Sequence, residues 1–456
     1  MPPGSASSLS FDGKSDLDLL FDFLRFRSVS TKPEQAGEMR ACADWLCSLL
    51  RHGGFQAEVA ETGGHPVVLA RGPEAPGKPT VLIYGHYDVQ PEEPVNLWTS
   101  PPFEPAIRNK RVFARGATDN KGQILAHILG AIHMLREEGE LPVNLIFLIE
   151  GEEEVGSTNL DDFIRARRSD LRCDIIAISD TGMIAEGYPT LTQSLRGIAA
   201  MEVIVRGPAT DLHSGIFGGA VMNPATALVK LLASLHDSQG RIAVPGFYDD
   251  VAKIDAAERE ALAALPVSET DYQRETGVLI LAGEEGFSTV ERIGIRPTAE
   301  INGLTSGYQG EGTKTVLPST ASAKLTFRLV PNQKPDRALN LVEIHFQNIL
   351  PPGVELEIIR GHGGMPYALD LKSPWCGAAL RALETTFGQK PALMREGGSI
   401  PIVQTFRDLL GSDTLLLGLA APDCKAHAPD ENFPIENFEA GIRLHQNLLR
   451  ELSAGA

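Results

Sequence analysis

Acidic and imidazole side chains gather at a few places in this sequence. His86 and Asp88 stand two positions apart, so in an extended chain they point to the same side. Three glutamates adjoin at 152–154, and carboxylates crowded in this way repel one another unless a cation is present. Imidazole and carboxylate groups together suit borderline divalent metals, with zinc favoured ahead of manganese or cobalt. A metal site is therefore indicated, for which the sequence offers three further candidate ligands, Asp119, Asp180 and His427.

Such a set of side chains could perform hydrolysis. A carboxylate shared between two metal ions can hold them about 3.5–4 Å apart. One more carboxylate is then needed to take a proton from the attacking water. A ligating histidine needs its second ring nitrogen held, and Asp88 could do this for His86. Plainer interpretations remain open: a surface turn around His86, a helix cap or Asx turn at Asp119, and a solvated acidic turn at 152–154.

Four short apolar runs place these candidates in space. Each run is almost continuously apolar, as in strands buried on both faces of an α/β sheet, and each is followed by candidate ligands. Ligands of open α/β sheets bind at the carboxyl ends of the strands, so the candidates should meet in one crevice. Helices are predicted at 15–26, capped by Ser15 or Asp16, at 36–52 and at 123–138. The four predicted strands are 80–84, 143–149, 174–179 and 414–419.

The middle of the chain has a different pattern. Segments 197–206 and 322–330 alternate between apolar and polar residues, as half-exposed strands do. Two amphipathic helices, 223–236 and 335–350, and a strand at 354–360 complete a β-α-β…β-α-β order. That order predicts a small α+β sandwich inserted into the larger domain. Residues 240–295 interrupt it with helical and loop character that has no evident place.

Composition excludes several other classes of protein. The 456 residues suffice for two sizeable cores, and the apolar and charged fractions, 43% and 22%, are those of a globular protein. A net charge of −18 argues against a nucleic-acid partner. The five cysteines form no C-x-x-C pair and indicate no disulfide scaffold, which fits a reducing cytoplasm. We expect no signal peptide and no membrane span, because no basic leader and no apolar run of about 18 residues occurs.

At this point the motifs resemble a known family. The chain is similar to the co-catalytic di-zinc metallopeptidases that include carnosinase, cytosolic nonspecific dipeptidase, bacterial glutamate carboxypeptidase and the acetylornithine and succinyl-diaminopimelate deacylases. The resemblance covers nearly the whole chain, and REGGSIP looks like the bacterial dipeptidase branch. The motifs, in the family's order, are GHYDVQP at 85–91, RGATDNKGQ at 115–123, EGEEEVGS at 150–157, SD at 179–180, HSGIFGGAVMNP at 213–224, GTKTVLP at 312–318, FRLVPNQ at 327–333, REGGSIP at 395–401 and HAPDEN at 427–432.

The resemblance implies a fold and a metal centre. Residues 1–194 and 372–456 would form an α/β catalytic domain with a mainly parallel mixed sheet flanked by helices. Residues 195–371 would form an α+β lid that also dimerises. Two divalent ions, zinc above all, would be bound by His86 and Asp180 on one side, by Glu154 and His427 on the other, and by Asp119 between them.

The resemblance also implies the catalytic groups. Asp88 would orient His86, and Glu153 would be the base that activates the bridging water and later protonates the leaving amine. Glu152 precedes both glutamates, which leaves a slip of one residue open, although Gly156 and Ser157 fix the register adopted here. The Asp119–Asn120 peptide is expected to be cis.

The lid would supply substrate contacts. His213 is expected to reach the partner subunit's site and stabilise the oxyanion, and Arg328 to hold the substrate carboxylate. Thr315, Gly398 and Ser399 would line the pocket. Two departures from the animal dipeptidases concern the substrate: Gly398 stands where they have serine, and Met365 where they have histidine, with His362 nearby.

The expected activity is metal-dependent hydrolysis of the peptide bond of dipeptides or short peptides by a cytoplasmic homodimer. The nearest alternative is an N-acyl-amino-acid deacylase or carbamoyl-amidohydrolase with the same metals. A non-catalytic binding protein is a second alternative, against which the complete set of ligand candidates argues. A two-metal phosphatase would need a phosphate-cradling glycine-rich loop, which the sequence lacks.

Overall fold

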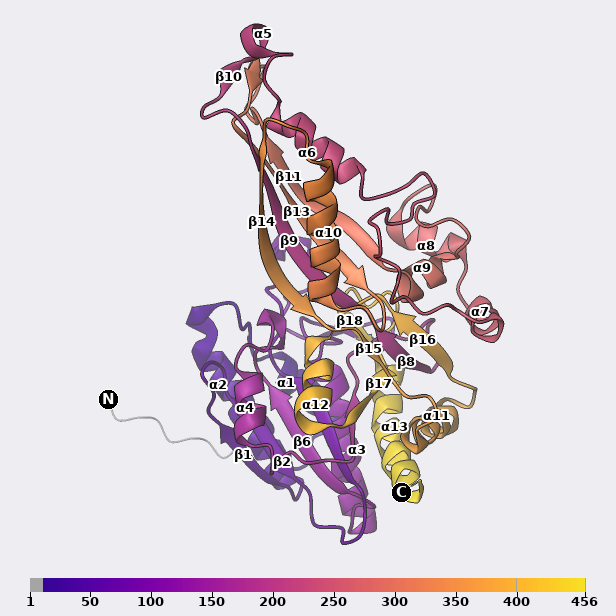
Figure 1. The fold of residues 1–456 in the computed structure, drawn as a ribbon. Helices are drawn as coiled ribbons and strands as arrows, with labels where there is room; N and C mark the ends of the chain where they lie inside the picture. The colour runs from indigo at the N-terminus through magenta and orange to yellow at the C-terminus, as the bar shows by residue number, and fades with distance from the viewer. Residues whose placement is uncertain (1–10, 399, 456) are drawn as a thin grey trace, which may run out of the picture. The chain divides into compact units, whose positions relative to one another are not determined.

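A computed structural model describes residues 11–398 and 400–455 (Figure 1). The chain forms two compact units. The first contains the described residues up to Gln193 together with Leu369–Met394 and those from Thr405 onward. The second contains Ser194–Ala368 and Arg395–Gln404. The short segment 395–404 thus belongs to the second unit, although it follows residue 371, where the sequence suggested a boundary.

A mixed sheet forms the centre of the first unit, in the order β1–β2–β6–β3–β7–β17–β8. The predicted apolar runs are its parallel strands: β3 (Thr80–His86) lies between β6 (Asn144–Glu150) and β7 (Ile175–Ile178), and β17 (Asp413–Gly418) follows β7. Their residues are almost all buried, which explains the continuous apolar pattern. The expectation of a mixed sheet is confirmed, and the parallel pairs lie at its centre. The antiparallel strands at its edges are β1 (Gln56–Ala60), β2 (Val67–Arg71) and β8 (Thr190–Leu195).

Helices cover this sheet (Figure 1). α2 (Ala36–His52) packs on β1 and β2, whereas α3 (Lys121–Glu138) packs on β3 and is covered in turn by α13 (Ile435–Ala454). α3 is buried along most of its length because it lies between the sheet and α13. Gly130 permits the close approach, since a Cβ there would lie 2.7 Å from the Ile442 carbonyl oxygen. Other elements that fall wholly or partly in this unit are α1 (Asp16–Leu24), η1 (Pro33–Gln35), η2 (Val95–Leu97), β4 (Ala106–Arg108), β5 (Arg111–Phe113), η3 (Glu153–Val155), α4 (Leu160–Ala166), α11 (Pro374–Phe387), β16 (Ala392–Glu396), α12 (Pro401–Leu410) and β18 (Asn432–Pro434).

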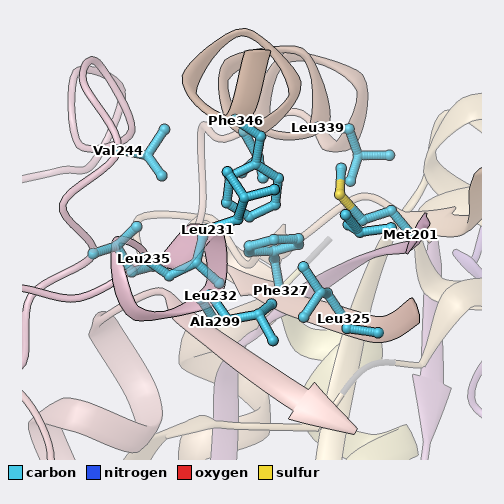
Figure 2. Packing of buried hydrophobic residues seen from close by; sticks show 14 of the residues in the cluster. Met201, Leu231, Leu232, Leu235, Val244, Ala299, Leu325, Phe327, Leu339 and Phe346 are labelled. Carbon is cyan, nitrogen blue, oxygen red and sulfur yellow. The ribbon is translucent and has the colours of Figure 1, made fainter. Parts of the chain in front are cut away.

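The second unit is the predicted α+β sandwich. Its antiparallel sheet has the order β11–β13–β9–β14, with β9 (Gly197–Arg206), β13 (Thr320–Leu329) and β14 (Glu355–Gly364) close to the predicted strands. α6 (Pro224–Ala233) and α10 (Pro335–Ile349) pack against this sheet. Figure 2 shows the core between them, where Phe327 of β13 meets Leu231 of α6 and Phe346 of α10.

Strand β11 (Thr298–Ser306) was not predicted from the sequence. It lies at the edge of the sheet, most of its side chains are at least partly exposed, and its register with β13 shifts between Ile301 and Gly303. An exposed, bulged edge strand has no clean apolar alternation, so its sequence pattern is weak. The remaining elements of this unit are β10 (Leu212–His213), α5 (Ser214–Phe217), α7 (Ala256–Ala263), α8 (Glu269–Thr276), α9 (Thr289–Ile295), β12 (Val316–Leu317) and β15 (Tyr367–Ala368).

Polar contacts organise the segment that the sequence could not place. Within residues 240–295 and their neighbours, the Arg296 guanidinium donates to both oxygens of Glu284 at 2.7 Å. The same guanidinium lies 4.4 Å from the Phe287 ring centroid and 4.7 Å from that of Tyr248. Ion pairs and cation–π contacts leave no apolar periodicity in the sequence. For this reason, the sequence pattern did not show how residues 240–295 fit into the α+β sandwich.

None of the helices within the described ranges combines the length and apolar character needed to cross a membrane. The five cysteines all lie in these ranges as free thiols, as the sequence indicated.

Candidate metal and active site

The candidate ligands lie around the carboxyl ends of the parallel strands in the first unit. His86 is the last residue of β3, and Asp180 follows β7 by two residues. Glu153 and Glu154 open η3, the turn that follows β6. Asp119 lies in the turn that precedes α3, and His427 in the loop after β17. Because parallel strands end at one edge of the sheet, these separate motifs converge in one place.

Two groups of potential ligands result, and they share one carboxylate. His86 Nε2 lies 3.2 Å from Asp119 Oδ1 and 3.7 Å from Asp180 Oδ2. His427 Nε2 lies 2.8 Å from Asp119 Oδ2 and 3.4 Å from Glu154 Oε2. Within each group the ligand atoms lie within 4.8 Å of one another, close enough to surround one ion. Asp119 thus offers one oxygen to each group, as a bridging ligand would.

The donor atoms of these groups fit divalent cations. Among the described residues, the buried atoms His86 Nε2 and Glu154 Oε1 have no hydrogen-bond partner, although Asp119 lies close to the first of them. Buried polar atoms without partners are uncommon and need an explanation. His86 and Glu154 belong to different groups, so two cations, one in each group, would satisfy them. Nitrogen with carboxylate oxygen is the donor set that zinc and similar metals use.

Asp88 has a wider role than the sequence suggested. Its backbone oxygen lies 3.0 Å from His86 Nδ1, whereas its carboxylate Oδ1 lies 3.4 Å away. The same carboxylate accepts hydrogen bonds from the backbone N–H groups of Glu153 at 3.2 Å and Glu154 at 3.0 Å. Asp88 is fully buried, so it connects the end of β3 to the glutamate turn.

Electrostatic crowding shifts the acids of this site. Burial, together with the charges of Asp180 and Asp119, raises the pKa of Glu153 to about 7, although His86 opposes the shift. Burial and the charge of Asp119 raise the pKa of Glu154 to about 8. Although burial alone would raise it, the pKa of Asp119 is lowered by hydrogen bonds from His427 and His86. A carboxylate with a pKa near 7 is suited to exchange protons at neutral pH.

The three adjacent glutamates point to different partners. Glu152 is buried and accepts both hydrogen bonds of the Asn159 side-chain amide, at 2.9 and 3.1 Å, so its carboxylate is occupied outside the two ligand groups. Glu154 is the member that lies beside His427. The register in which Glu153 would be the base and Glu154 the ligand stays a prediction.

Sequence reasoning overlooked two amides at this site. Gln90 donates from Nε2 to Glu154 Oε2 at 2.7 Å, and Asn120 donates from Nδ2 to Asp180 Oδ1 at 2.8 Å. Gln90 lies in the motif GHYDVQP and Asn120 in the motif RGATDNKGQ, but only the folded chain shows which carboxylate each one contacts. The Asp119–Asn120 peptide is cis, as expected.

Two candidates in the second unit lie together on a small ribbon. His213 of β10 pairs with Val316 of β12, and the Ser214 N–H donates to the Thr315 carbonyl oxygen at 3.1 Å. The His213 Nδ1 accepts from the Gly215 N–H at 3.0 Å, and the side chain is exposed. Figure 1 shows β10 and α5 at one end of the sheet of this unit.

The other candidates of this unit lie near the opposite end of β13. Arg328 is the next-to-last residue of that strand. The positive charge of Arg328 acts on Arg196. Burial and this nearby charge lower the pKa of Arg196 to about 10. Arg196 in turn donates to the Gly397 carbonyl oxygen at 3.1 Å, next to exposed Gly398. Ser399 lies outside the described residues, while His362 and Met365 are exposed in or just after β14.

Comparison with known proteins agrees with this fold. Peptidase family M20/M25/M40 matches residues 82–451. "Cys-Gly metallodipeptidase dug1" of Schizosaccharomyces pombe is 34% identical over 444 residues, or 94% of this chain and 93% of that protein. "Beta-Ala-His dipeptidase" of Rattus norvegicus is 32% identical over 393 residues, covering 85% of this chain and 80% of that one. The crystal structure of an M20 family metallo-carboxypeptidase, Sso-CP2 from Sulfolobus solfataricus, is 32% identical, covers 97% of this chain and 100% of its own, and has a TM-score of 0.85.

The chain therefore belongs to peptidase family M20/M25/M40, a family of metal-dependent peptidases. The resemblance drawn from the motifs is confirmed.

Proposed function

We propose that this protein is a metallodipeptidase with a two-metal active site. The observation that carries the proposal is the pair of ligand groups that share Asp119, with Glu153 beside them at the ends of the parallel strands. Similarity over most of the chain to relatives named as dipeptidases supports the same activity.

The proposed ligands are His86 and Asp180 for one ion, Glu154 and His427 for the other, and Asp119 for both. Zinc is the proposed metal because imidazole and carboxylate form its usual donor set, with manganese and cobalt as alternatives. When bound, two such ions supply Lewis-acid polarisation of the scissile carbonyl and lower the pKa of a water. The residues of the chain supply the positioning and the proton transfers.

Glu153 is the proposed general base and acid. Its carboxylate takes a proton from the water that attacks the peptide carbonyl carbon, so a C–O bond forms and a tetrahedral oxyanion develops. When the C–N bond breaks, Glu153 returns the proton to the leaving amine. Asp88 keeps Glu153 in place through the backbone N–H of that residue and supports the ring of His86.

The proposed substrate contacts come from the second unit. A guanidinium pairs with a carboxylate through two parallel hydrogen bonds, so Arg328 is the proposed partner of the substrate carboxylate. Thr315, Gly398 and Ser399 are proposed to line the pocket. Dipeptides and other short peptides have a free carboxylate close to the scissile bond, and this is the group that such a guanidinium would pair with.

We also propose a homodimer in which His213 and Thr315 both act in the partner subunit's site. Within one second unit, Thr320 and Arg328 are eight residues apart along β13, about 25 Å. His213 and Thr315 lie beyond the Thr320 end, so they cannot contact a dipeptide that Arg328 of the same unit holds. Two apolar side chains next to His213 are exposed, Ile216 to 69% and Phe217 to 40%, and a second subunit could cover them.

The cytoplasm is the proposed location, because free cysteines fit a reducing compartment.

An N-acyl-amino-acid deacylase is the alternative, since it would use the same metals and the same base. Hydrolysis rates on a panel of dipeptides and on the matching N-acetyl amino acids, after reconstitution with zinc, manganese and cobalt separately, distinguish the two. We expect dipeptides to be cleaved with the higher kcat/KM. A preference for N-acetyl amino acids would favour the alternative, and no hydrolysis with any metal would reject both.

A further inference from the structure

A buried carboxylate outside the ligand set holds the turn that carries Asp119. Glu431 is 0% exposed and accepts four hydrogen bonds. Its Oε2 accepts from Arg115 Nη1 at 2.8 Å and from the Gly116 N–H at 2.9 Å. Its Oε1 accepts from the N–H groups of Thr118 and Asp119, each at 3.0 Å. Every lone-pair direction of this carboxylate is thus directed at the segment 115–119.

The charge of Glu431 is balanced within the same turn. Arg115 is 1% exposed, donates from its other terminal nitrogen to the Pro91 carbonyl oxygen at 3.1 Å, and lies 5.3 Å from the Trp98 ring centroid. A buried ion pair is tolerated when its geometry is good and its remaining hydrogen-bonding groups are satisfied. The geometry is good and both terminal nitrogens of Arg115 donate, whereas its buried Nε has no hydrogen-bond partner among the described residues. With all four of its hydrogen bonds directed at the turn, Glu431 acts as an acceptor for the backbone.

The turn needs such an acceptor because it belongs to no strand or helix. Residues 114–120 lie between β5 and α3, outside both ladders, so their N–H groups depend on partners elsewhere. Glu431 also accepts the Ala114 N–H through its own backbone oxygen at 3.2 Å. One residue therefore fixes the turn through both its side chain and its main chain.

Glu431 is also tied to a second ligand. It stands four residues after His427, in the loop whose histidine lies 2.8 Å from Asp119. Through Glu431, the loop that carries His427 and the turn that carries Asp119 are joined by five hydrogen bonds. The backbone of Asp119 therefore cannot move away from this loop without breaking at least one of these hydrogen bonds.

We propose that Glu431 is the positioning residue of the metal centre, which holds the carboxylate of Asp119 between His86 and His427 before any ion binds. The inference rests on the proposed metal site but not on the identity of the substrate. It differs from an ordinary structural role, because a carboxylate that only stabilised the fold would affect unfolding without affecting metal affinity.

The test compares Glu431→Gln with a matched control. Glutamine has nearly the same shape, but only one of its two terminal atoms can accept, so either the Arg115–Gly116 pair or the Thr118–Asp119 pair of donors meets an NH₂ group. The control is Glu291→Gln in the second unit. Glu291 is also buried, 5% exposed, and accepts from the Ser288 N–H and from Arg259 Nε, both at 2.7 Å.

Zinc affinity is measured on full-length protein by competition with a chromophoric chelator, and the absorption spectrum is recorded after loading with Co²⁺. Loss of a partner that orients metal ligands typically weakens metal binding about 10- to 100-fold, and we expect a loss of this size for Glu431→Gln with an altered Co²⁺ spectrum. We expect Glu291→Gln to keep wild-type affinity and spectrum. Unchanged affinity in Glu431→Gln, or an equal loss in both variants, would overturn the proposal.

A measurement on wild-type protein covers the case in which Glu431→Gln does not fold. Amide hydrogen exchange at Gly116, Thr118 and Asp119 is followed with the metal removed and after zinc is added. Because Glu431 accepts these N–H groups without help from an ion, we expect protection before zinc is added. Protection that develops only with zinc would overturn the proposal. The proposed metal site fails separately if wild-type protein binds no zinc, and the proposed dipeptidase activity fails separately if zinc-loaded wild-type protein cleaves no dipeptide.

Discussion

Glu153 is the carboxylate that the proposed reaction uses twice, first as a base and then as an acid. That double use requires a pKa near the working pH, and burial among other acids raises its pKa to about 7. Its neighbours in the sequence are chemically identical but are engaged otherwise, Glu152 with Asn159 and Glu154 beside His427. Three glutamates in a row thus have three different environments.

We expect Glu153→Gln to lower kcat by at least about 10²–10⁴-fold, the usual contribution of a general acid–base group. Bound metal should stay at the wild-type stoichiometry, because Glu153 is not a proposed ligand. Steady-state kinetics and metal analysis of purified protein check both points. Glu152→Gln is the matched control and should keep its activity, since its carboxylate contacts Asn159. A Glu153→Gln variant with near wild-type kcat would contradict the assignment.

Glu150 gives a prediction on pH and stability. Burial raises the pKa of this side chain to about 8, although hydrogen bonds from Tyr84 and Ser157 oppose the shift. The native protein therefore keeps a proton that the unfolded chain releases near pH 4.5, so this group stabilises the fold at low pH and the contribution is lost as the pH rises towards 8.

Glutamine at position 150 has no proton to lose and can still accept from Tyr84. Relative to wild type, we expect Glu150→Gln to gain on the order of 3 kcal/mol in free energy of unfolding between pH 5 and pH 8.5. Urea unfolding of metal-free protein at the two pH values measures this gain. A difference between variant and wild type that does not change with pH would show that Glu150 is already ionised in the native protein.

At the scale of elements, the site depends on where strands end and helices begin. β3 and β7 bring His86 and Asp180 to one edge of the sheet, and α3 begins at Lys121, two residues after Asp119. Gly122 in the first turn of α3 makes this last arrangement possible. A Cβ at position 122 would lie 2.0 Å from the Ala117 carbonyl oxygen and 2.7 Å from the Phe433 ring, so the turn 115–119 approaches the helix closely.

Gly122→Ala is therefore expected to destabilise the protein by about 1–3 kcal/mol, the usual cost of overpacking, and to weaken zinc binding because the turn must move. Gly37 in α2 is the matched control: nothing lies within 4 Å of its Cβ position, and alanine there should stabilise the helix by about 0.5–1 kcal/mol. Urea unfolding and chelator competition measure the two effects. Equal stability of the two variants would contradict the packing argument.

At the scale of the whole molecule, we propose that two chains share each active site. Within one subunit, β13 separates the His213 ribbon from Arg328 by about 25 Å, whereas a dipeptide is much shorter. Removal of one oxyanion-stabilising donor from an enzyme typically lowers kcat by about 10²–10³-fold, and we expect a decrease of this size for His213→Ala. A monomer made by disrupting the subunit contact should lose activity to a similar extent.

Mixing two inactive homodimers tests this arrangement. His213→Ala and Glu153→Ala proteins, allowed to exchange subunits, should recover up to about a quarter of wild-type activity, because about half of the dimers are mixed and each mixed dimer contains one complete site. Exchange is verified independently by tagging one variant. If exchange is complete and no activity returns, His213 does not act across subunits.

The sequence by itself determined the four parallel strands of the first unit and the candidate ligands that follow them. Buried parallel strands leave continuous apolar runs, and the polar residue after each run is visible without a structure, which is how His86 and Asp180 were predicted. The order of the motifs then identified the family. The edge strand β11 and the segment 240–295 escaped prediction because exposure, a bulge and ion pairs leave no periodic pattern.

Only the tertiary structure decided which atoms meet. The partners of Asp88, Gln90 and Glu431 lie far away in the chain, and hydrogen-bond geometry depends on distances of a few tenths of an ångström that no sequence pattern records. For the same reason, only the fold showed that Glu152 is occupied by Asn159 and that Glu154 lies beside His427. Residue types predicted a metal site, and the packing of distant loops determined its geometry.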